Sequence, residues 1–278
     1  MSGPYWLVGL SFLTVSSAQA QLGSNSCYPG ALPNVVDVYP TSDRLPENTL
    51  RFYIYFSAPM DRASVFSAIS LNDRNGRNIE NGFLKNVSDL WSPDGTRLTL
   101  LMDPGRVKTG LYANDAFGQA LKAGGRYTLS IGTTATSNQG CPLSEPNLKT
   151  FEVSDRDQSV PNPLFWSIAA PDAGSFDSLK VEMSEMIDHL SLAYRIRVLS
   201  SSDAPVPGRI DIGVEERAWY FTPHNSWDDD EYTIRVDPVL EDIAGNRMTG
   251  LFDRPVDADK DTMPKPRYIQ FNPVSAPE

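Results

Sequence analysis

Residues 52–61 read FYIYFSAPMD, and residues 179–188 read LKVEMSEMID. Apolar side chains fall at alternate positions in the first half of both segments, which is the period of a β-strand with one buried face. Each segment then continues into a serine and ends in Met-Asp or Ile-Asp, at a constant offset of 127 positions (179 − 52). The two segments therefore predict the same strand and turn in two copies of one structural unit.

Two further blocks repeat in the same order along the chain. In each copy the last strand leads into a polar turn with a glycine, the residue that accepts positive φ most readily. Short strands at regular spacing, without a long segment of helical period, predict an all-β protein made of two tandem Ig-like β-sandwiches. The paired blocks are 98–104 (LTLLMDP) with 219–223 (WYFTP), and 127–131 (YTLSI) with 232–236 (YTIRV).

These motifs resemble the bacterial Ig-like domains of the surface-layer (SbsA-type) class. Such domains carry a Phe-Ser-x-Pro-Met-Asp segment, a Leu-Thr-Leu-x-x-x-Pro strand, a Tyr-Thr-Leu strand and an Asp-x-Ala-Gly-Asn turn. The resemblance implies an extracytoplasmic spacer, adhesive or accessory module, and it brings no catalytic residues with it. The resemblance covers about residues 34–152 and 164–252. The residues that carry it are Pro40 and segments 56–61, 98–104, 127–129, 232–234 and 242–246.

The sequence departs from this pattern in two places. Gly140-Cys141 stands where Gly-Asn is typical, and residues 185–187 (EMI) replace the Ala-Pro-Met segment. The inserted segment 103–108 (DPGRVK) also resembles a group of two-domain secreted bacterial proteins.

The N-terminal segment resembles a signal peptide. An apolar run at residues 6–15 is followed by SSAQA, in which Ala18 and Ala20 form the A-x-A pattern of a cleavage site. No Lys or Arg precedes the run, so an apolar first strand remains the alternative. The predicted organisation is a signal peptide at 1–20, a first domain at 21–153 with an inserted loop at 105–118, a second domain at 164–256, and a tail at 257–278.

Composition excludes several classes of partner. The net charge of −11 repels phosphate backbones, so nucleic-acid binding is not expected. The apolar run at residues 6–15 is shorter than the roughly 20 residues of a membrane helix, so no membrane span is predicted. The expected location is the periplasm or the cell surface, with an unknown protein or glycan partner.

The chain contains two cysteines, Cys27 and Cys141. An even number of cysteines in an exported protein predicts a disulfide, and two separate thiols are the alternative. Two cysteines without a neighbouring histidine make a poor metal site, and we expect no cofactor.

The sequence contains no motif of a catalytic site. It has no H-E-x-x-H, no G-x-S-x-G and no glycine-rich phosphate loop. His189 and His224 lie in different segments and are interpreted as surface residues. The predicted function is therefore a non-enzymatic structural, adhesive or binding module. A carbohydrate-binding or accessory protein and an unrecognised hydrolase with a distant Ser-His-Asp triad are the alternatives.

The inserted loop at residues 105–118 is the most individual feature of the sequence. Arg106, Lys108, Tyr112 and Phe117 are candidate binding residues, because long ordered loops on rigid scaffolds often carry function. The alternative is a lid that packs Leu111, Tyr112 and Phe117 over the edge of the sandwich.

Two other groups of residues have weaker functional interpretations. Trp91, Trp166, Trp219 and Trp227 could stack on carbohydrate or pack in the cores and at interfaces. Oxygen ligands for calcium are available at Asp228, Asp229, Asp230 and Asp242, but solvated or locally hydrogen-bonded turns are the favoured interpretation. No metal site is predicted.

Overall fold

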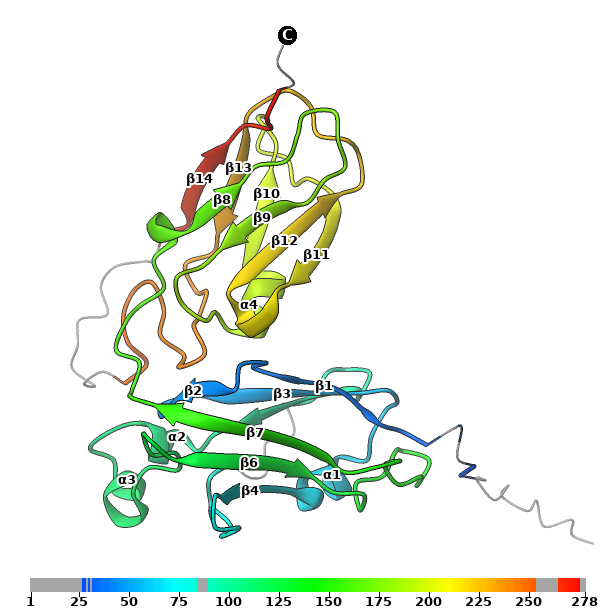
Figure 1. The fold of residues 1–278 in the computed structure, drawn as a ribbon, viewed down its shortest axis with the longest axis vertical. Coiled ribbons are helices and arrows are strands. Elements are labelled where there is room, and N and C mark those ends of the chain that lie inside the picture. Colours follow the sequence, from blue (N-terminus) through cyan, green and yellow to red (C-terminus); the bar gives the residue numbers. More distant parts are fainter. Residues whose placement is uncertain (1–26, 29, 31, 85–89, 254–264, 276–278) are drawn as a thin grey trace, which may run out of the picture.

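The computed structural model describes residues 27–28, 30, 32–84, 90–253 and 265–275. The predicted signal peptide at 1–20 lies outside these residues. The described chain is all-β, as predicted, and consists of Ig-like β-sandwiches with a few short helices. Figure 1 shows the strands in two bodies, each with its own sheets. Within the described residues, no helix combines the length and apolarity needed to cross a membrane.

The first sandwich is built from two sheets, with strand orders β1-β3-β5 and β2-β7-β6-β4. All neighbouring strands are antiparallel except β2 and β7, which are parallel. Its elements are β1 (Val35–Tyr39), β2 (Arg44–Pro46), β3 (Arg51–Phe56), α1 (Arg62–Ala68), β4 (Ile69–Asp73), β5 (Arg97–Leu101), α2 (Pro104–Val107), α3 (Tyr112–Phe117), β6 (Arg126–Ile131) and β7 (Asn147–Ser154).

The alternation that predicted β3 also determines its core face. Phe52, Ile54 and Phe56 point between the two sheets and belong to the first hydrophobic core. Tyr53 is on the opposite face of β3, yet it is also buried. The outer face of the sheet β1-β3-β5 must therefore be covered by another part of the molecule.

The second sandwich has sheets of order β11-β12-β9-β8 and β10-β13-β14 around a separate core. The strand β9 again alternates, with Leu179 and Val181 buried in that core. Its elements are η3 (Pro163–Phe165), β8 (Ser167–Ala169), β9 (Leu179–Glu182), α4 (His189–Tyr194), β10 (Ile196–Leu199), β11 (Gly208–Ile212), η4 (Val214–Glu216), β12 (Ala218–Pro223), β13 (Tyr232–Val236) and β14 (Arg267–Phe271).

The assignment of residues 257–278 to a tail outside the second domain is wrong for β14. This strand pairs with β13 along its whole length, and Phe271 is buried in the second core. A polar composition with several prolines obscured a single apolar strand that completes the sheet. Beyond it, Val274 forms a parallel bridge with Asp172, as β2 does with β7 in the first sandwich.

The predicted disulfide is confirmed between Cys27 and Cys141, with an S–S distance of 2.09 Å. It closes a loop across a sequence separation of 114 residues. In the chain-entropy model, a loop of this length stabilises the folded state by about 5 kcal/mol. The disulfide attaches the N-terminal segment to the turn that follows β6.

Candidate functional site

Each sandwich has one end with the same local structure, at positions related by the 127-residue offset. Asp61 caps the N-terminus of α1 and accepts a hydrogen bond from the Ser64 N–H at 2.8 Å. Asp188 caps α4 and accepts one from the Ser191 N–H at 3.0 Å. In both cases a side-chain oxygen satisfies a backbone donor that the first turn of a helix leaves free.

The turns that complete these two ends are also equivalent. In the first sandwich the Ser137 hydroxyl accepts hydrogen bonds from the backbone two and four residues later. In the second, the Asp242 carboxylate does the same towards Ala244 and Asn246. Gly140 and Gly245 occupy the left-handed position, with φ of 79° and 80°. The predicted role of glycine in the two turns is thus confirmed.

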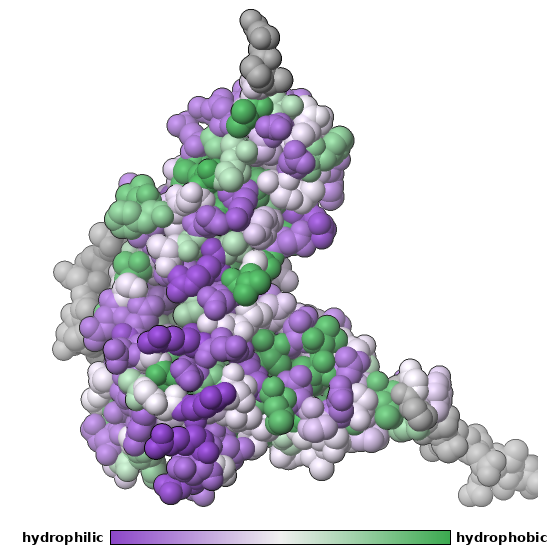
Figure 2. Space-filling view, in the orientation of Figure 1, coloured by the Kyte–Doolittle hydropathy of each residue, from purple (hydrophilic) through white to green (hydrophobic). Residues whose placement is uncertain are grey.

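The end of the second sandwich packs against the outer face of the sheet β1-β3-β5 (Figure 1). We call this contact, made by residues 186–191, 214–217 and 241–247, the junction. Ile243 is buried in the core of the first sandwich, and its carbonyl accepts a hydrogen bond from the Leu50 N–H at 2.9 Å. Figure 2 shows the two sandwiches as two lobes that meet at an angle.

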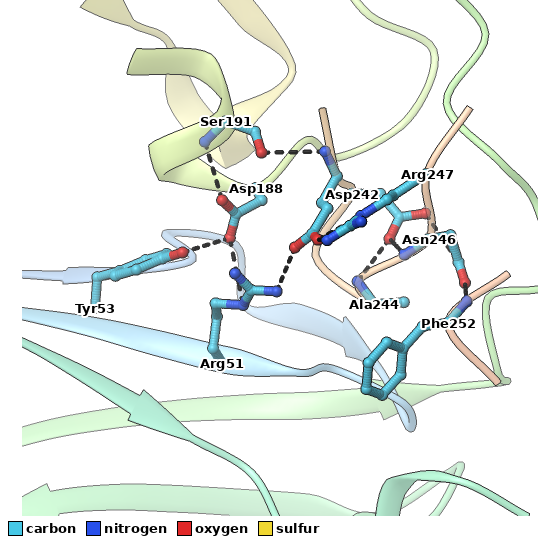
Figure 3. Close-up of polar contacts among 10 residues, drawn as sticks. Arg51, Tyr53, Asp188, Ser191, Asp242, Ala244, Asn246, Arg247 and Phe252 are labelled. Atoms are coloured by element: carbon cyan, nitrogen blue, oxygen red, sulfur yellow. Dashed lines mark hydrogen bonds and ion pairs between the residues drawn. The ribbon is translucent and has the colours of Figure 1, made fainter. Parts of the chain in front are cut away.

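A cluster of charged and polar side chains lies at the centre of the junction (Figure 3). The Tyr53 hydroxyl donates to Asp188 at 2.7 Å, and the Arg51 guanidinium lies 3.9 Å from the same carboxylate. Arg51 also forms an ion pair with Glu241, whose N–H donates to the Ser191 hydroxyl at 3.1 Å. The outer face of β3 thereby binds the capping aspartate of α4.

Burial changes the acid–base behaviour of this cluster. It raises the pKa of the Asp188 carboxyl, while the Arg51 guanidinium and the Tyr53 hydroxyl oppose that rise. It also raises the pKa of Tyr53, and the adjacent Asp188 raises it further. Tyr53 therefore remains a neutral hydrogen-bond donor. Removal of one partner from such a buried pair typically costs about 3–5 kcal/mol, because the remaining charge is left without a partner.

A second polar contact joins η4 to the connection between β1 and β2. The Thr41 N–H donates to both carboxyl oxygens of Glu216, at 2.9 and 3.0 Å. The Glu215 N–H donates to the Thr41 hydroxyl at 2.8 Å. Glu215 and Glu216 have φ of 60° and 53°, a left-handed conformation that costs about 1–3 kcal/mol for each non-glycine residue. Contact with the first sandwich holds η4 in this conformation.

The interpretation of His189 as a surface residue is wrong. The imidazole stacks on Tyr39, with ring centroids 3.6 Å apart, and its Nε2 lies 3.1 Å from the Tyr55 hydroxyl. Burial, with a smaller contribution from Arg97, lowers the pKa of His189 to about 4. His224 is exposed, as predicted. No described Ser and Asp form a hydrogen-bonded triad with either histidine.

Arg106, a candidate binding residue, has a structural role. Its buried guanidinium donates to backbone carbonyl groups of Glu80, Phe117, Gly118 and Gln119. These contacts fix the inserted loop to the sandwich. The arginine is therefore directed away from any ligand in solution.

Lys108 also contacts another part of the protein. Its ammonium group lies 4.3 Å from the centroid of the Phe252 ring, and the neighbouring Thr109 donates to Asp253. Arg156, in the connection between the two sandwiches, forms ion pairs with Asp253 at 2.9 Å and with Glu47 at 3.4 Å. The inserted loop thus helps to fasten the closing segment of the second sandwich to the first.

The other two candidate residues of the loop are on its surface. Tyr112 is 83% exposed and Phe117 is 62% exposed, and Leu111 between the two short helices is 41% exposed. The alternative in which these three side chains pack over the edge of the sandwich is therefore wrong. The Arg106 guanidinium donates to the backbone carbonyl groups of the loop. The exposed apolar side chains are therefore not needed to hold the loop in place.

The acidic candidates do not converge on one position. Asp242 is buried, and its carboxylate accepts three hydrogen bonds within its own turn, including one from the Asn246 amide at 2.9 Å. Asp228, Asp229 and Asp230 are exposed, and the last two bind serine hydroxyls. In the described part of the chain, no three His, Cys, Asp or Glu side chains group as metal ligands.

Three of the four candidate tryptophans are core residues of the second sandwich, so these three do not form a carbohydrate platform. Trp166 is 8% exposed and Trp227 is 1% exposed, and Trp219 is fully buried. Trp91, in the first sandwich, is half-buried and stacks on Phe56. Their rings thus pack against other side chains of the two cores.

Sequence reasoning missed the junction, although one signal was available. The outward positions of β3 carry Arg51, Tyr53 and Tyr55, whereas the offset positions in the second copy are Ser178, Lys180 and Glu182. Two tyrosines on a face assigned to solvent indicate that another surface covers it.

No known protein family matches the sequence, and no curated protein matches it either. Solved structures with Ig-like or related β-domains are similar at low TM-score. A fragment of Escherichia coli alpha-2-macroglobulin spanning domains MG0-NIE-MG1 matches with a TM-score of 0.30 and 13% identity, over 74% of this chain and 66% of the fragment. The S-layer protein SbsC matches with a TM-score of 0.29 and 14% identity, over 73% of this chain and 23% of that protein. The titin domains Z1Z2, in complex with telethonin, match at 0.23 and 14% identity, over 74% and 88%.

Proposed function

We propose that this protein is an exported, non-enzymatic structural module of the cell envelope that holds two Ig-like sandwiches at a fixed angle. The observation that carries this proposal is the buried cluster of Arg51, Tyr53, Asp188 and Glu241 in the junction. Domains within a chain usually move relative to one another unless their interface is large and apolar. Here Ile243 enters the first core, so separation of the sandwiches would expose its apolar side chain to water, and the charges buried beside it favour one relative orientation.

Export is supported by two features of the chain. A disulfide between Cys27 and Cys141 persists in oxidising compartments and is rare in the cytosol. The resemblance of residues 1–20 to a signal peptide agrees with that location. The proposed domains are 21–153 and a second one from 164 that includes β14, and we propose that both belong with the surface-layer type of Ig-like domain.

The structural role is tested by small-angle X-ray scattering of the protein and of two matched variants. Asp188→Ala removes the central carboxylate of the junction, whereas Asp61→Ala removes the equivalent cap outside the junction. The radius of gyration is expected to increase in Asp188→Ala and to stay unchanged in Asp61→Ala. Equal radii in all three proteins would show that this network does not set the angle.

Export is tested by fractionation of cells that express the full chain and a chain that lacks residues 1–20. The full chain should appear outside the cytosol with Cys27 and Cys141 resistant to alkylation. The shortened chain should remain in the cytosol, where both thiols react with the reagent. Retention of the full chain in the cytosol would contradict the proposed location.

A second candidate function is binding through the inserted loop, because Tyr112 and Phe117 are exposed on a loop that Arg106 braces. A photo-crosslinking residue at position 112 in living cells tests this candidate, with the exposed Leu148 as the control position. Crosslinks at 112 alone would support a protein partner. A glycan array with Tyr112→Ala and Phe117→Ala variants tests the carbohydrate alternative.

A further inference from the structure

Glu216 is a fully buried carboxyl group at the junction without an ion pair. It is 0% exposed, and its carboxyl group accepts hydrogen bonds from the Thr41 N–H. No charged group within the described residues forms an ion pair with it. The nearby Lys149 ammonium instead donates to the carbonyl groups of Thr41 and Ser42, both at 3.1 Å. A carboxylate in such surroundings is costly, and the neutral acid is favoured.

The charged groups that face Glu216 do not reverse this preference. Lys149 on β7 favours the ionised form, and Asp188, before α4, opposes it. Tyr39 on β1 is a neutral neighbour whose own pKa is raised, mainly by burial. Burial is the largest effect and raises the pKa of Glu216 to about 7, although the Thr41 hydrogen bonds lower it in part. In an open junction, η4 would expose this side chain to water and restore its ordinary value.

His189 has the opposite preference for a reason that is also geometric. Its ring is held between Tyr39 and Tyr55, and its Nδ1 is buried without a hydrogen-bond partner among the described residues. An imidazolium has two N–H donors and needs an acceptor for each. The Arg97 guanidinium is close enough to disfavour a second positive charge. The closed junction therefore holds the neutral imidazole.

We infer that closure of the junction exchanges protons in opposite directions: Glu216 takes one up from solvent while His189 releases one to solvent. The inference rests on the proposed fixed junction and adds how two of its residues respond to pH. At a pH between the ordinary values of the two side chains, 4.5 and 6.5, the proton that Glu216 takes up balances the proton that His189 releases. Closure then involves no net proton uptake by this pair. Within that range, each of the two residues cancels the pH dependence that the other alone would give to closure.

The signs and sizes of the two effects follow from linkage. Glu216 has a raised pKa in the closed state, so its contribution is present at low pH and is lost as the pH rises through about 7. His189 has a lowered pKa, so its contribution is present above its ordinary value of 6.5 and is lost as the pH falls towards about 4. From about pH 8 to about pH 5, Glu216 favours closure by roughly 70-fold and His189 opposes it by roughly 30-fold.

The test is hydrogen exchange at the Leu50 amide, which donates to Ile243 across the junction and touches neither residue. After correction for intrinsic rates, its protection reports the opening equilibrium between about pH 5 and about pH 8. The variants are Glu216→Gln and His189→Gln, with matched controls at the exposed Glu145→Gln and His224→Gln, both outside the junction. Other titrating groups, such as Asp242, are common to all proteins and cancel in the ratio of each variant to the wild type, apart from Asp188, whose interaction with Glu216 is lost in Glu216→Gln.

Relative to wild type, Glu216→Gln should lose roughly 70-fold in protection from about pH 8 to about pH 5, and His189→Gln should gain roughly 30-fold. Both controls should follow the wild-type profile. Variant profiles parallel to wild type would overturn the inference and leave the proposed function intact. An unprotected Leu50 amide in the wild type at every pH would instead overturn the fixed junction itself.

A titration of the wild-type protein keeps the inference testable if a variant does not fold. Carbon-13 NMR should give a midpoint near 7 for the Glu216 carboxyl and near 4 for the His189 ring. Midpoints at the ordinary values, 4.5 and 6.5, would overturn the proton exchange.

Discussion

Asp61 and Asp188 occupy the same position at the ends of the two sandwiches, but only one of them contacts the other sandwich. Both cap a short helix through the N–H of a serine three residues later. Asp61 is exposed, whereas Asp188 is buried against Arg51 and Tyr53. The same backbone structure thus serves as a free end in one copy and as half of an interface in the other. The side chains around the cap decide which of the two it becomes.

The serines of the two caps extend this comparison. The Ser64 hydroxyl accepts a hydrogen bond from the Thr136 N–H at 2.9 Å, and the Ser191 hydroxyl accepts one from the Glu241 N–H at 3.1 Å. The residue that donates this N–H differs in its side chain: threonine stands in the first copy and glutamate in the second. That glutamate binds Arg51, so one difference on a common backbone adds an ion pair to the junction.

The largest expected effect separates the two aspartates. Asp188→Ala should lower the free energy of unfolding by about 3–5 kcal/mol, because it removes the helix cap, leaves the buried Tyr53 hydroxyl without its acceptor and leaves Arg51 with Glu241 alone. Asp61→Ala should cost only about 1 kcal/mol, the usual value of a helix cap. Urea titration measures both. Equal losses would mean that the two ends are energetically alike.

A further variant divides the role of Asp188 into its two parts. Asp188→Asn retains a good capping side chain but removes the negative charge that faces Arg51. A loss close to that of alanine would assign the cost to the charge, and a small loss would assign it to the cap.

The disulfide strengthens the first end, where the second has a hydrogen-bonded asparagine. Cys141 occupies the turn position equivalent to Asn246, whose side chain accepts from the Phe252 N–H at 2.9 Å. Replacement of both cysteines by serine should lower the free energy of unfolding by about 2–5 kcal/mol. Asn246→Ala should cost about 1–3 kcal/mol, because it leaves buried groups unsatisfied. Chemical denaturation measures the loss of unfolding free energy in both variants. A larger loss in Asn246→Ala than in the double cysteine variant would contradict this prediction.

The smallest expected difference lies between the two turn glycines. A Cβ at Gly140 would meet nothing within 4 Å, so Gly140→Ala should cost about 1–2 kcal/mol from its left-handed conformation alone. A Cβ at Gly245 would lie 2.5 Å from the Leu50 Cδ2 in the first sandwich. Gly245→Ala should therefore cost about 1 kcal/mol more than Gly140→Ala. Thermal melting measures both variants, and equal melting temperatures would contradict close packing of Gly245 at the junction.

Local rules explain which parts of the fold were predictable. The alternation in residues 52–56 and 179–183 depends only on one buried face, so both strands were predicted. The glycine turns and the disulfide also follow from residue type and compartment. The residues of β14 were assigned to a tail outside the second domain, because their neighbours in sequence are polar.

The junction could not be predicted in the same way. Its contacts join residues more than 130 positions apart, such as Tyr53 and Asp188, and no spacing rule relates them. The role of Arg106 in the inserted loop was not predictable for a related reason. Arg106 looked available for a ligand, but it donates to the backbone of its own loop, which only the folded path of residues 117–119 determines.

The central claim is that the junction holds the two sandwiches at one angle. The most direct test is a distance measurement by electron spin resonance, with labels at the exposed Ser67 in α1 and Ser202 in the turn after β10. Our account predicts one narrow distance distribution in the wild type and a broad one in Asp188→Ala. A broad distribution in the wild type would contradict the claim.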